Sequence, residues 1–214
     1  MKPSDKISPF ELYSQEYDLW YEKEGVIYQA EVKALLELLP PIKEALEVGV
    51  GTGRFAQPLK INYGIDPASA MLKIACSRLP FLVKGKAENL PFAKESFELA
   101  LMITTICFLD NLEKAFAEIQ RILKPKGWLL LGFIDRESEL GRFYQRKKAQ
   151  SKFYAPARFF SVPEIVSYLE EAGFGDFEFR QTLFISPTQK ILSPQPIEKG
   201  WGRGGFIVLR SKKL

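Results

Sequence analysis

The segment Glu44–Arg54, with the sequence EALEVGVGTGR, constrains the fold of this chain more than any other. Its apolar part, Ala45–Val48, is too short for a helix and is bounded by turn residues, which predicts a buried strand. Glycines follow at alternate positions and let a ligand approach the backbone: Gly49, Gly51 and Gly53. A helix is predicted to begin at Arg54 and to present free N–H groups at its start. The pattern is typical of a nucleotide-binding loop in a βαβ unit, although a glycine triplet alone favours an ordinary turn.

An acidic residue follows the second predicted strand. Residues 61–65 (INYGI) form that strand, and Asp66 comes directly after it, about 20 residues beyond Glu47. This is the offset at which a carboxylate meets a ribose in such units, and a carboxylate can accept from two adjacent hydroxyls at once. Asp66 followed by Pro67 is also a good helix N-cap with proline at the first helical position. The two roles are compatible.

The loop favours a ligand that contains adenosine but no phosphates. A dinucleotide loop has a third glycine where this chain has Arg54, which counts against NAD and FAD. No G-x-x-x-x-G-K-[ST] segment follows, so a triphosphate P-loop is not predicted. A carboxylate of the ligand would then lie at the helix N-terminus, where other nucleotides place a phosphate.

Successive segments of the chain resemble a known family. These segments are 47–53 (EVGVGTG), 64–71 (GIDPASAM), 87–92 (AENLPF), 96–100 (SFELA) and 121–128 (RILKPKGW). In this order and spacing they are similar to the motifs of class I S-adenosylmethionine-dependent methyltransferases. The small single-domain branch that includes ubiquinone and menaquinone C-methyltransferases is the most similar. The resemblance covers residues 44–135 and does not specify a substrate.

The resemblance implies a fold, a cofactor and a set of binding residues. The implied fold is α/β, a Rossmann-like, doubly wound, seven-stranded sheet that is mostly parallel, with an antiparallel C-terminal hairpin and helices on both faces. The implied cofactor is S-adenosyl-L-methionine, bound by Glu47, Gly49, Val50, Gly51, Thr52, Gly53, Asp66, Pro67, Met71, Ala87, Glu88, Thr104 and Thr105. Family members commonly have Asp where this chain has Lys86. Adenine recognition is therefore expected to rest on Ala87 and Glu88.

Composition places the chain among globular proteins with one main domain. It has 214 residues, 46% of them hydrophobic, and a net charge of +4 that is too small to argue for a nucleic-acid partner. Its cysteines, Cys76 and Cys107, lie in apolar segments without metal-ligand spacing, so we expect reduced, buried thiols and no metal. Residues 1–10 do not resemble a signal peptide, and the longest apolar stretch is too short to span a bilayer. We expect a cytoplasmic monomer or homodimer.

Two regions outside the motifs are candidates for a substrate-covering role. Residues 1–40 are predicted to form an N-terminal helical cap on a domain spanning 41–214. Tyr13, Tyr17 and Tyr21 share one helical face there, either packed on the domain or closing over the reacting methyl. Residues 138–160 interleave basic and aromatic side chains where the family places a substrate-cap insertion. Such a run is a solvated helix face, an anchor for an acidic substrate or an RNA-contacting strip.

The predicted function is methyl transfer to a small-molecule N, O or C nucleophile. The alternatives are an RNA methyltransferase and a non-catalytic methyltransferase-like binding module. The chain contains no histidine, so a general base, where one is needed, must come from another residue type. The candidates are Asp135, which ends the strand 128–134, and Tyr17. Residues 177–184 and 205–209 are the predicted C-terminal hairpin, joined by the long loop 186–204.

Overall fold

The computed structural model describes residues 4–41, 43–184 and 193–214. Among these residues no helix has both the length and the apolar character needed to cross a membrane. The elements are, in order, α1 (Ser4–Leu12), α2 (Ser14–Lys23), α3 (Gly25–Leu38), β1 (Ala45–Val48), β2 (Tyr63–Asp66), α4 (Ser69–Ala75), β3 (Phe81–Lys84), β4 (Phe97–Ile103), η1 (Ile106–Phe108), α5 (Leu112–Ile122), β5 (Leu123–Ile134), α6 (Glu139–Lys147), η2 (Lys148–Gln150), α7 (Val162–Glu171), β6 (Phe174–Thr182), β7 (Glu198–Lys199) and β8 (Phe206–Lys213).

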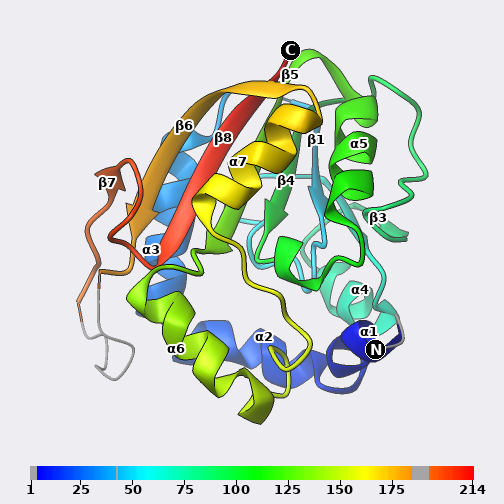
Figure 1. Cartoon of the computed structure of the whole chain (residues 1–214). Helices are drawn as coiled ribbons and strands as arrows, with labels where there is room; N and C mark the ends of the chain where they lie inside the picture. Colours follow the sequence, from blue (N-terminus) through cyan, green and yellow to red (C-terminus); the bar gives the residue numbers. More distant parts are fainter. Residues whose placement is uncertain (1–3, 42, 185–192) are drawn as a thin grey trace.

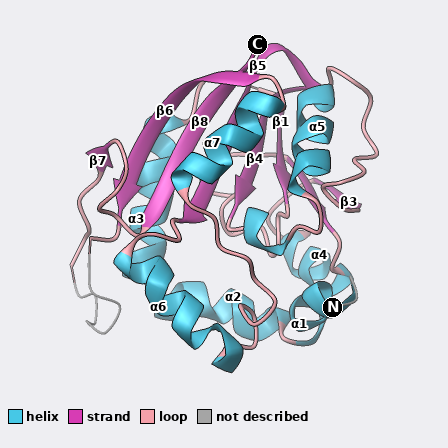
Figure 2. Cartoon of the chain, viewed as in Figure 1, coloured by secondary structure: helices cyan, strands magenta, loops and turns pink. Residues whose placement is uncertain are grey.

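The strands of the described residues form one sheet in the order β3-β2-β1-β4-β5-β8-β6-β7. The first five strands along the chain are parallel, and β8 runs antiparallel to both β5 and β6. Helices α5 and α7 lie over one face of the sheet and α3 lies over the other (Figure 1; Figure 2 gives the same view by element type). This confirms the predicted α/β class, the doubly wound, mostly parallel sheet and the antiparallel C-terminal pair.

The sheet has eight strands in the described residues, where seven were predicted. The additional strand is β7, a two-residue segment that pairs with β6 through Arg180 and Lys199. A strand of this length carries no period-2 signal of its own, so only its pairing partner defines it. It lies within the predicted loop 186–204, and residues 186–192 of this loop are outside the described residues.

The central strand β4 is buried on both faces. Leu99, Leu101 and Ile103 belong to the apolar cluster that contains Leu35 of α3. Ala100 and Met102 point the other way, into the cluster formed with α5 and α7. A strand covered on both sides needs apolar residues at every position, which explains the unbroken apolar run in the sequence.

The helix predicted to begin at Arg54 is not formed. Residues 51–60 make consecutive turns instead, with the side chains of Phe55 and Leu59 buried. Pro58 has no N–H to donate, and Lys60 adopts a positive φ of 58°, so a regular helix cannot extend through this segment. The glycine loop is therefore followed by a compact turn segment.

Cys76, predicted to be buried, is exposed, whereas Cys107 is buried as predicted. Cys76 is the C-cap of α4, and this short helix leaves its last turn at the surface. Cys107 lies in η1, where burial raises the pKa of its thiol to about 12. Both thiols are free.

Candidate functional site

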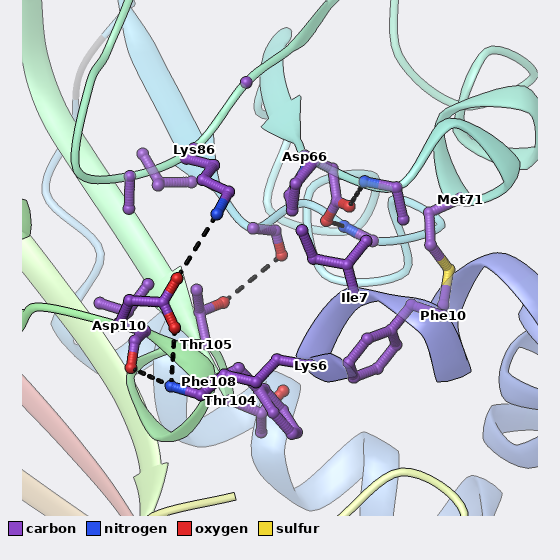
Figure 3. Close-up of a pocket in the computed structure, with 18 of the residues that line it drawn as sticks. Lys6, Ile7, Phe10, Asp66, Met71, Lys86, Thr104, Thr105, Phe108 and Asp110 are labelled. Carbon is purple, nitrogen blue, oxygen red and sulfur yellow. Dashed lines mark hydrogen bonds and ion pairs between the residues drawn. The ribbon is translucent and has the colours of Figure 1, made fainter. Parts of the chain in front are cut away.

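A cavity lies at the carboxyl ends of β1, β2 and β4 (Figure 3). Here the strand order reverses between β1 and β4, which is where open α/β sheets bind ligands. We call it the first cavity. Many of the residues predicted to bind the cofactor lie on its wall, namely Gly49, Gly51, Asp66, Pro67, Met71, Ala87, Glu88, Thr104 and Thr105.

Asp66 ties the glycine loop to the turn before α4. One carboxylate oxygen accepts the Gly51 N–H at 2.9 Å, and the other accepts the Ala68 N–H at 2.8 Å (Figure 3). Burial raises the pKa of Asp66 to about 6, while these two N–H groups act to lower it. A carboxylate has about four acceptor positions, so Asp66 can accept further hydrogen bonds from a ligand.

The predicted capping role of Asp66 falls to a distant residue. The N-cap of α4 is Ala68, which makes no side-chain cap bond. The carboxylate of Glu11, from α1, instead accepts the N–H groups of Ser69 and Ala70 at 2.6 and 2.9 Å. A negative side chain at a helix N-terminus is stabilising, so this contact fixes α1 beside the first cavity.

The glycine loop brings backbone close to the cavity. Gly49 has a φ of 73°, and a Cβ at this position would collide with the Thr105 side chain. Thr105 in turn donates to the Ile103 carbonyl at 3.0 Å. Gly51 has a φ of 54° and faces the ring of Tyr17 across the cavity wall. A larger residue at Gly49 would displace either the loop or Thr105.

The other predicted cofactor residues lie behind the wall of the first cavity rather than on it. These residues are Glu47, Val50, Thr52 and Gly53. Glu47 is buried, and its Oε2 has no hydrogen-bond partner among the described residues. Burial and the neighbouring charge of Asp66 raise the pKa of Glu47 well above its usual range. The protonated form of Glu47 is therefore favoured behind the wall of the first cavity.

Lys86 takes part in a charge cluster at the rim of the first cavity. Asp110 pairs with Lys6 at 3.0 Å and with Lys86 at 3.4 Å (Figure 3). Glu88 also reaches this turn, where one of its oxygens accepts the Asp110 N–H at 2.8 Å. An acidic residue, Asp110, is thus present at the rim of the first cavity. It comes from the segment after η1 and not from the position of Lys86.

Sequence reasoning missed the contribution of α1 and η1 to the first cavity. Lys6, Ile7 and Phe10 of α1 line it, as does Phe108 of η1. A short helix with few apolar residues gives no local sign of which surface it covers. The only sign in the sequence that these helices cover a site was the aromatic content of the first 21 residues.

A second cavity adjoins the first. It shares with the first cavity the residues Phe10, Tyr17, Thr104 and Phe108. The rest of its wall mixes aromatic, aliphatic and charged side chains and comes from α2, α3, β5, α6, the segment after η2 and Leu183. The aromatic members of this part are Trp20, Tyr21, Tyr144, Phe153 and Tyr154, and Glu31 is an acidic one.

Of the two candidate bases, Tyr17 lies at the junction of the cavities and Asp135 does not. The Tyr17 hydroxyl is 2.7 Å from the Tyr21 hydroxyl, and burial raises the pKa of Tyr17 well above its usual range. Asp135 is buried and lines neither cavity. Its carboxylate accepts the Glu137 N–H at 3.1 Å in the turn before α6. Tyr17 is thus a neutral hydroxyl next to the wall residue Thr104.

Comparison with known proteins shows matches to methyltransferases along the whole chain. The model of the methyltransferase domain family matches residues 46–131. An S-adenosylmethionine-dependent methyltransferase of Thermotoga maritima, described as a possible histamine N-methyltransferase, has a crystal structure that superposes with a TM-score of 0.93. It is 46% identical and covers 97% of this chain and 99% of its own.

Two curated relatives match over different shares of the chain, and one of them is named a methyltransferase. An uncharacterized protein of Methanocaldococcus jannaschii is 39% identical, over 97% of this chain and 100% of its own length. The malonyl-[acyl-carrier protein] O-methyltransferase of Halorhodospira halophila is 27% identical, and this match covers 73% of the chain but only 58% of that relative.

Proposed function

The chain belongs to the S-adenosylmethionine-dependent methyltransferases, and on this premise we propose that it methylates a small molecule held in the second cavity. The observation that carries the proposal is the junction of the two cavities. Tyr17 and Thr104 line both, so a ligand in the first cavity and a ligand in the second would meet there. Pockets lined by aromatic side chains with a few polar groups are typical of small-molecule sites.

The first cavity fits the cofactor, S-adenosyl-L-methionine. In our proposal the buried Asp66 carboxylate accepts the ribose hydroxyls, and Ala87 and Glu88 border the adenine. The backbone of Gly49 and Gly51 lies against the ribose and the methionine part. Thr104 and Thr105 border the methyl group. The orientation of Asp66 supports this placement, because both of its oxygens are held by backbone N–H groups at the cavity wall.

The protein's main task in this reaction is alignment. The sulfonium of the cofactor supplies a methyl group that is already activated. Holding the reacting atoms in line at about 3–3.5 Å can supply several kcal/mol of the barrier. A neutral amine needs no base, whereas a phenol or a carbon acid does. The raised pKa of Tyr17 keeps its hydroxyl protonated, so Tyr17 is better suited to holding the substrate by a hydrogen bond than to acting as a base. Asp135, which lines neither cavity, is a candidate for a structural role.

Residues 138–160 and the N-terminal helices are proposed to form the substrate cap. Tyr144, Phe153 and Tyr154 of the 138–160 region line the second cavity. Lys152 pairs with Glu16 at 2.8 Å, and Arg142 lies 3.7 Å from Glu137, whereas Arg146 and Lys147 form no ion pair among the described residues. An RNA-contacting strip needs outward rings, so the three inward rings favour the cap over the RNA alternative.

The test is thermal unfolding with and without S-adenosylmethionine and S-adenosylhomocysteine, followed by mass spectrometry of methylated small molecules and RNA. A ligand at about 100 times its dissociation constant adds about 2.7 kcal/mol of stability. We expect this shift in the wild type and its loss in Asp66→Ala. Asp176→Asn is the matched control, because Asp176 is exposed in β6 at the opposite edge of the sheet and should keep the shift. A wild type that shows no shift with either ligand would overturn the proposal in favour of a non-catalytic module.

A further inference from the structure

The second cavity contains a buried acidic side chain that the proposed function does not use. Glu31 lies on the inward stripe of α3, one turn before Leu35, and is only 5% exposed. No side chain or backbone group of the described residues donates a hydrogen bond to its carboxylate or pairs with it. An isolated carboxyl group in such a place is costly, and burial raises the pKa of Glu31 to about 8. A core position of this kind would be better filled by an apolar residue.

Tyrosines from three other segments gather around Glu31. Tyr21 of α2, Tyr144 of α6 and Tyr154 of the segment after η2 all have pKa values raised by burial and, to a lesser extent, by the charge of Glu31. The rings of Tyr144 and Tyr154 are 5.0 Å apart between centroids. Aromatic faces attract cations, and the attraction grows when the cation is desolvated. The wall therefore combines a carboxyl group with several electron-rich rings.

At the rim of the second cavity, a lysine of the protein already lies against an aromatic ring and beside a carboxylate. The Lys152 ammonium lies 4.7 Å from the centre of the Tyr13 ring and pairs with Glu16. That pair is about half exposed and neutralises itself. Deeper in the cavity the described residues supply no cation for Glu31. The chemistry that would complete the deeper site is an amine in its ammonium form.

We propose that the second cavity recognises the cationic amino group of the methyl acceptor, with Glu31 as its anionic anchor and Tyr21, Tyr144 and Tyr154 as its aromatic wall. The inference deepens the proposed function and rests on it, because it names the substrate class of that site as a small amine with an apolar body. Glu31 acts in binding and specificity, and its role requires no chemical step. An ammonium has no lone pair to attack the methyl, so the nucleophile is another atom of the same molecule.

The proposal predicts a direction of pH dependence. The ammonium needs the ionised form of Glu31, so amine binding strengthens as the pH rises from 6 to 8. Since the pKa of Glu31 is about 8, close to one proton is released per amine bound at pH 6 and about half a proton at pH 8. Tyr21, Tyr144 and Tyr154 line the same cavity as Glu31, and burial raises the pKa of each, so none of them titrates in this range. Tyr28 on α3 also feels the Glu31 charge, and burial raises its pKa. Of the other nearby acidic residues, Glu16 is paired with Lys152 and Glu37 with Arg180 of β6, whereas Glu24, whose charge also acts on Tyr144, forms no ion pair among the described residues.

The experiment is calorimetric titration at pH 6 and pH 8 with 2-phenylethylamine and hexylamine, each beside its alcohol analogue. We expect both amines to bind the wild type at least tenfold more tightly at pH 8 than their alcohols do. In Glu31→Gln the preference for the amine and its pH dependence should disappear, while the alcohols bind as before. Glu37→Gln removes the same charge from α3 outside the cavity and should keep the preference.

Folding does not confound this test, because the glutamine is a neutral isostere of the protonated Glu31. Since the pKa of Glu31 is raised, its contribution to stability falls as the pH rises from about 4.5 to about 8. Glu31→Gln should therefore melt no lower than the wild type at pH 8. Equal binding of amine and alcohol, or an unchanged preference in Glu31→Gln, would overturn the inference. The thermal shift with S-adenosylmethionine is measured separately, so failure of the proposed function is distinguishable from failure of the amine site.

Discussion

Two buried carboxyl groups beside the glycine loop have different environments and hence different charges. Asp66 accepts two backbone N–H groups, which partly offset the effect of burial, and its pKa is about 6. Glu47 has an unpartnered Oε2 among the described residues, and burial together with the charge of Asp66 raises its pKa well above the usual range. The surroundings thus favour an ionised acceptor at the wall of the first cavity and a protonated acid behind it. Two negative charges at this spot would oppose each other.

The residue-scale prediction concerns Asp66 and pH. Because ribose hydroxyls donate to the ionised form, we expect the Kd for S-adenosylmethionine to rise below pH 6, by up to about tenfold per pH unit. The raised pKa also means that the contribution of Asp66 to stability falls between about pH 4 and pH 6. In Asp66→Asn the affinity should be at least about tenfold lower at pH 8, through loss of a charged acceptor, and should not change between pH 5 and 8. A variant whose pH profile matches that of the wild type would argue against this role.

At the scale of elements, the N-terminal helices are attached to the sheet's loops by polar contacts as well as by packing. Glu11 of α1 caps α4, and Lys6 bonds the Leu109 carbonyl at 2.7 Å. Asp18 of α2 accepts hydrogen bonds from Arg54 of the segment after the glycine loop and from Arg78 after α4. The partners lie on either side of the first cavity. Helices α1 and α2 are therefore held over the site at several points.

The element-scale prediction is that Asp18→Asn loosens α2 from the glycine loop. Partial burial alone would raise the pKa of Asp18, but the hydrogen bonds from Arg54 and Arg78 lower it below its usual range. The substitution should cost about 1–3 kcal/mol in the free energy of unfolding and weaken cofactor binding. In the wild type this contribution is present above about pH 4 and is lost as the pH falls further.

Glu22→Gln is the matched control for Asp18→Asn. Glu22 lies one turn further along α2 and pairs with the same arginine, Arg54, but its side chain is 61% exposed. Its loss should cost less than about 1 kcal/mol. Denaturant unfolding measures both variants, and equal costs would show that the position of Asp18 between the two arginines adds nothing.

At the scale of the molecule, the last strand of the described chain completes the sheet. β8 lies between β5 and β6, and its residues 206–209 are fully buried. It packs on α3, whose inward stripe also carries Glu31. The position of the second cavity thus depends on a strand that comes about 170 residues after the helix lining it.

The molecule-scale prediction is that deletion of residues 206–214 prevents cooperative folding. It would leave the edges of β5 and β6 unpaired and uncover the apolar faces of α3 and β5. Circular dichroism and thermal melting should show no cooperative transition. Deletion of Leu214 alone, which is 78% exposed, should change stability by no more than about 1 kcal/mol. A cooperative transition in the longer deletion would contradict the assigned role of β8.

Local patterns in the sequence were enough to predict the layers of the fold and the residues of the first cavity's wall that lie at the ends of strands. The apolar run of β4, the glycines after β1 and Asp66 after β2 each follow from spacing within a few residues, because period and strand end fix which side chains reach the crevice. The turn segment after Gly53 was mispredicted as a helix, since Pro58 and the buried side chains around it outweigh the family pattern. The short strand β7 was missed because it exists only through its pairing with β6.

Only the tertiary structure decided which side chains from distant elements cover the two cavities. Glu11 caps a helix 58 positions away, and Glu31 joins Tyr144 and Tyr154 in one cavity. The sequence does show that Glu31 is an acidic residue on an otherwise apolar helical stripe. A stripe does not reveal which side chains of other elements face it. These contacts depend on how separate elements pack against one another across the sheet. That packing minimises exposed apolar surface over the whole molecule, so it has no counterpart in any short stretch of sequence.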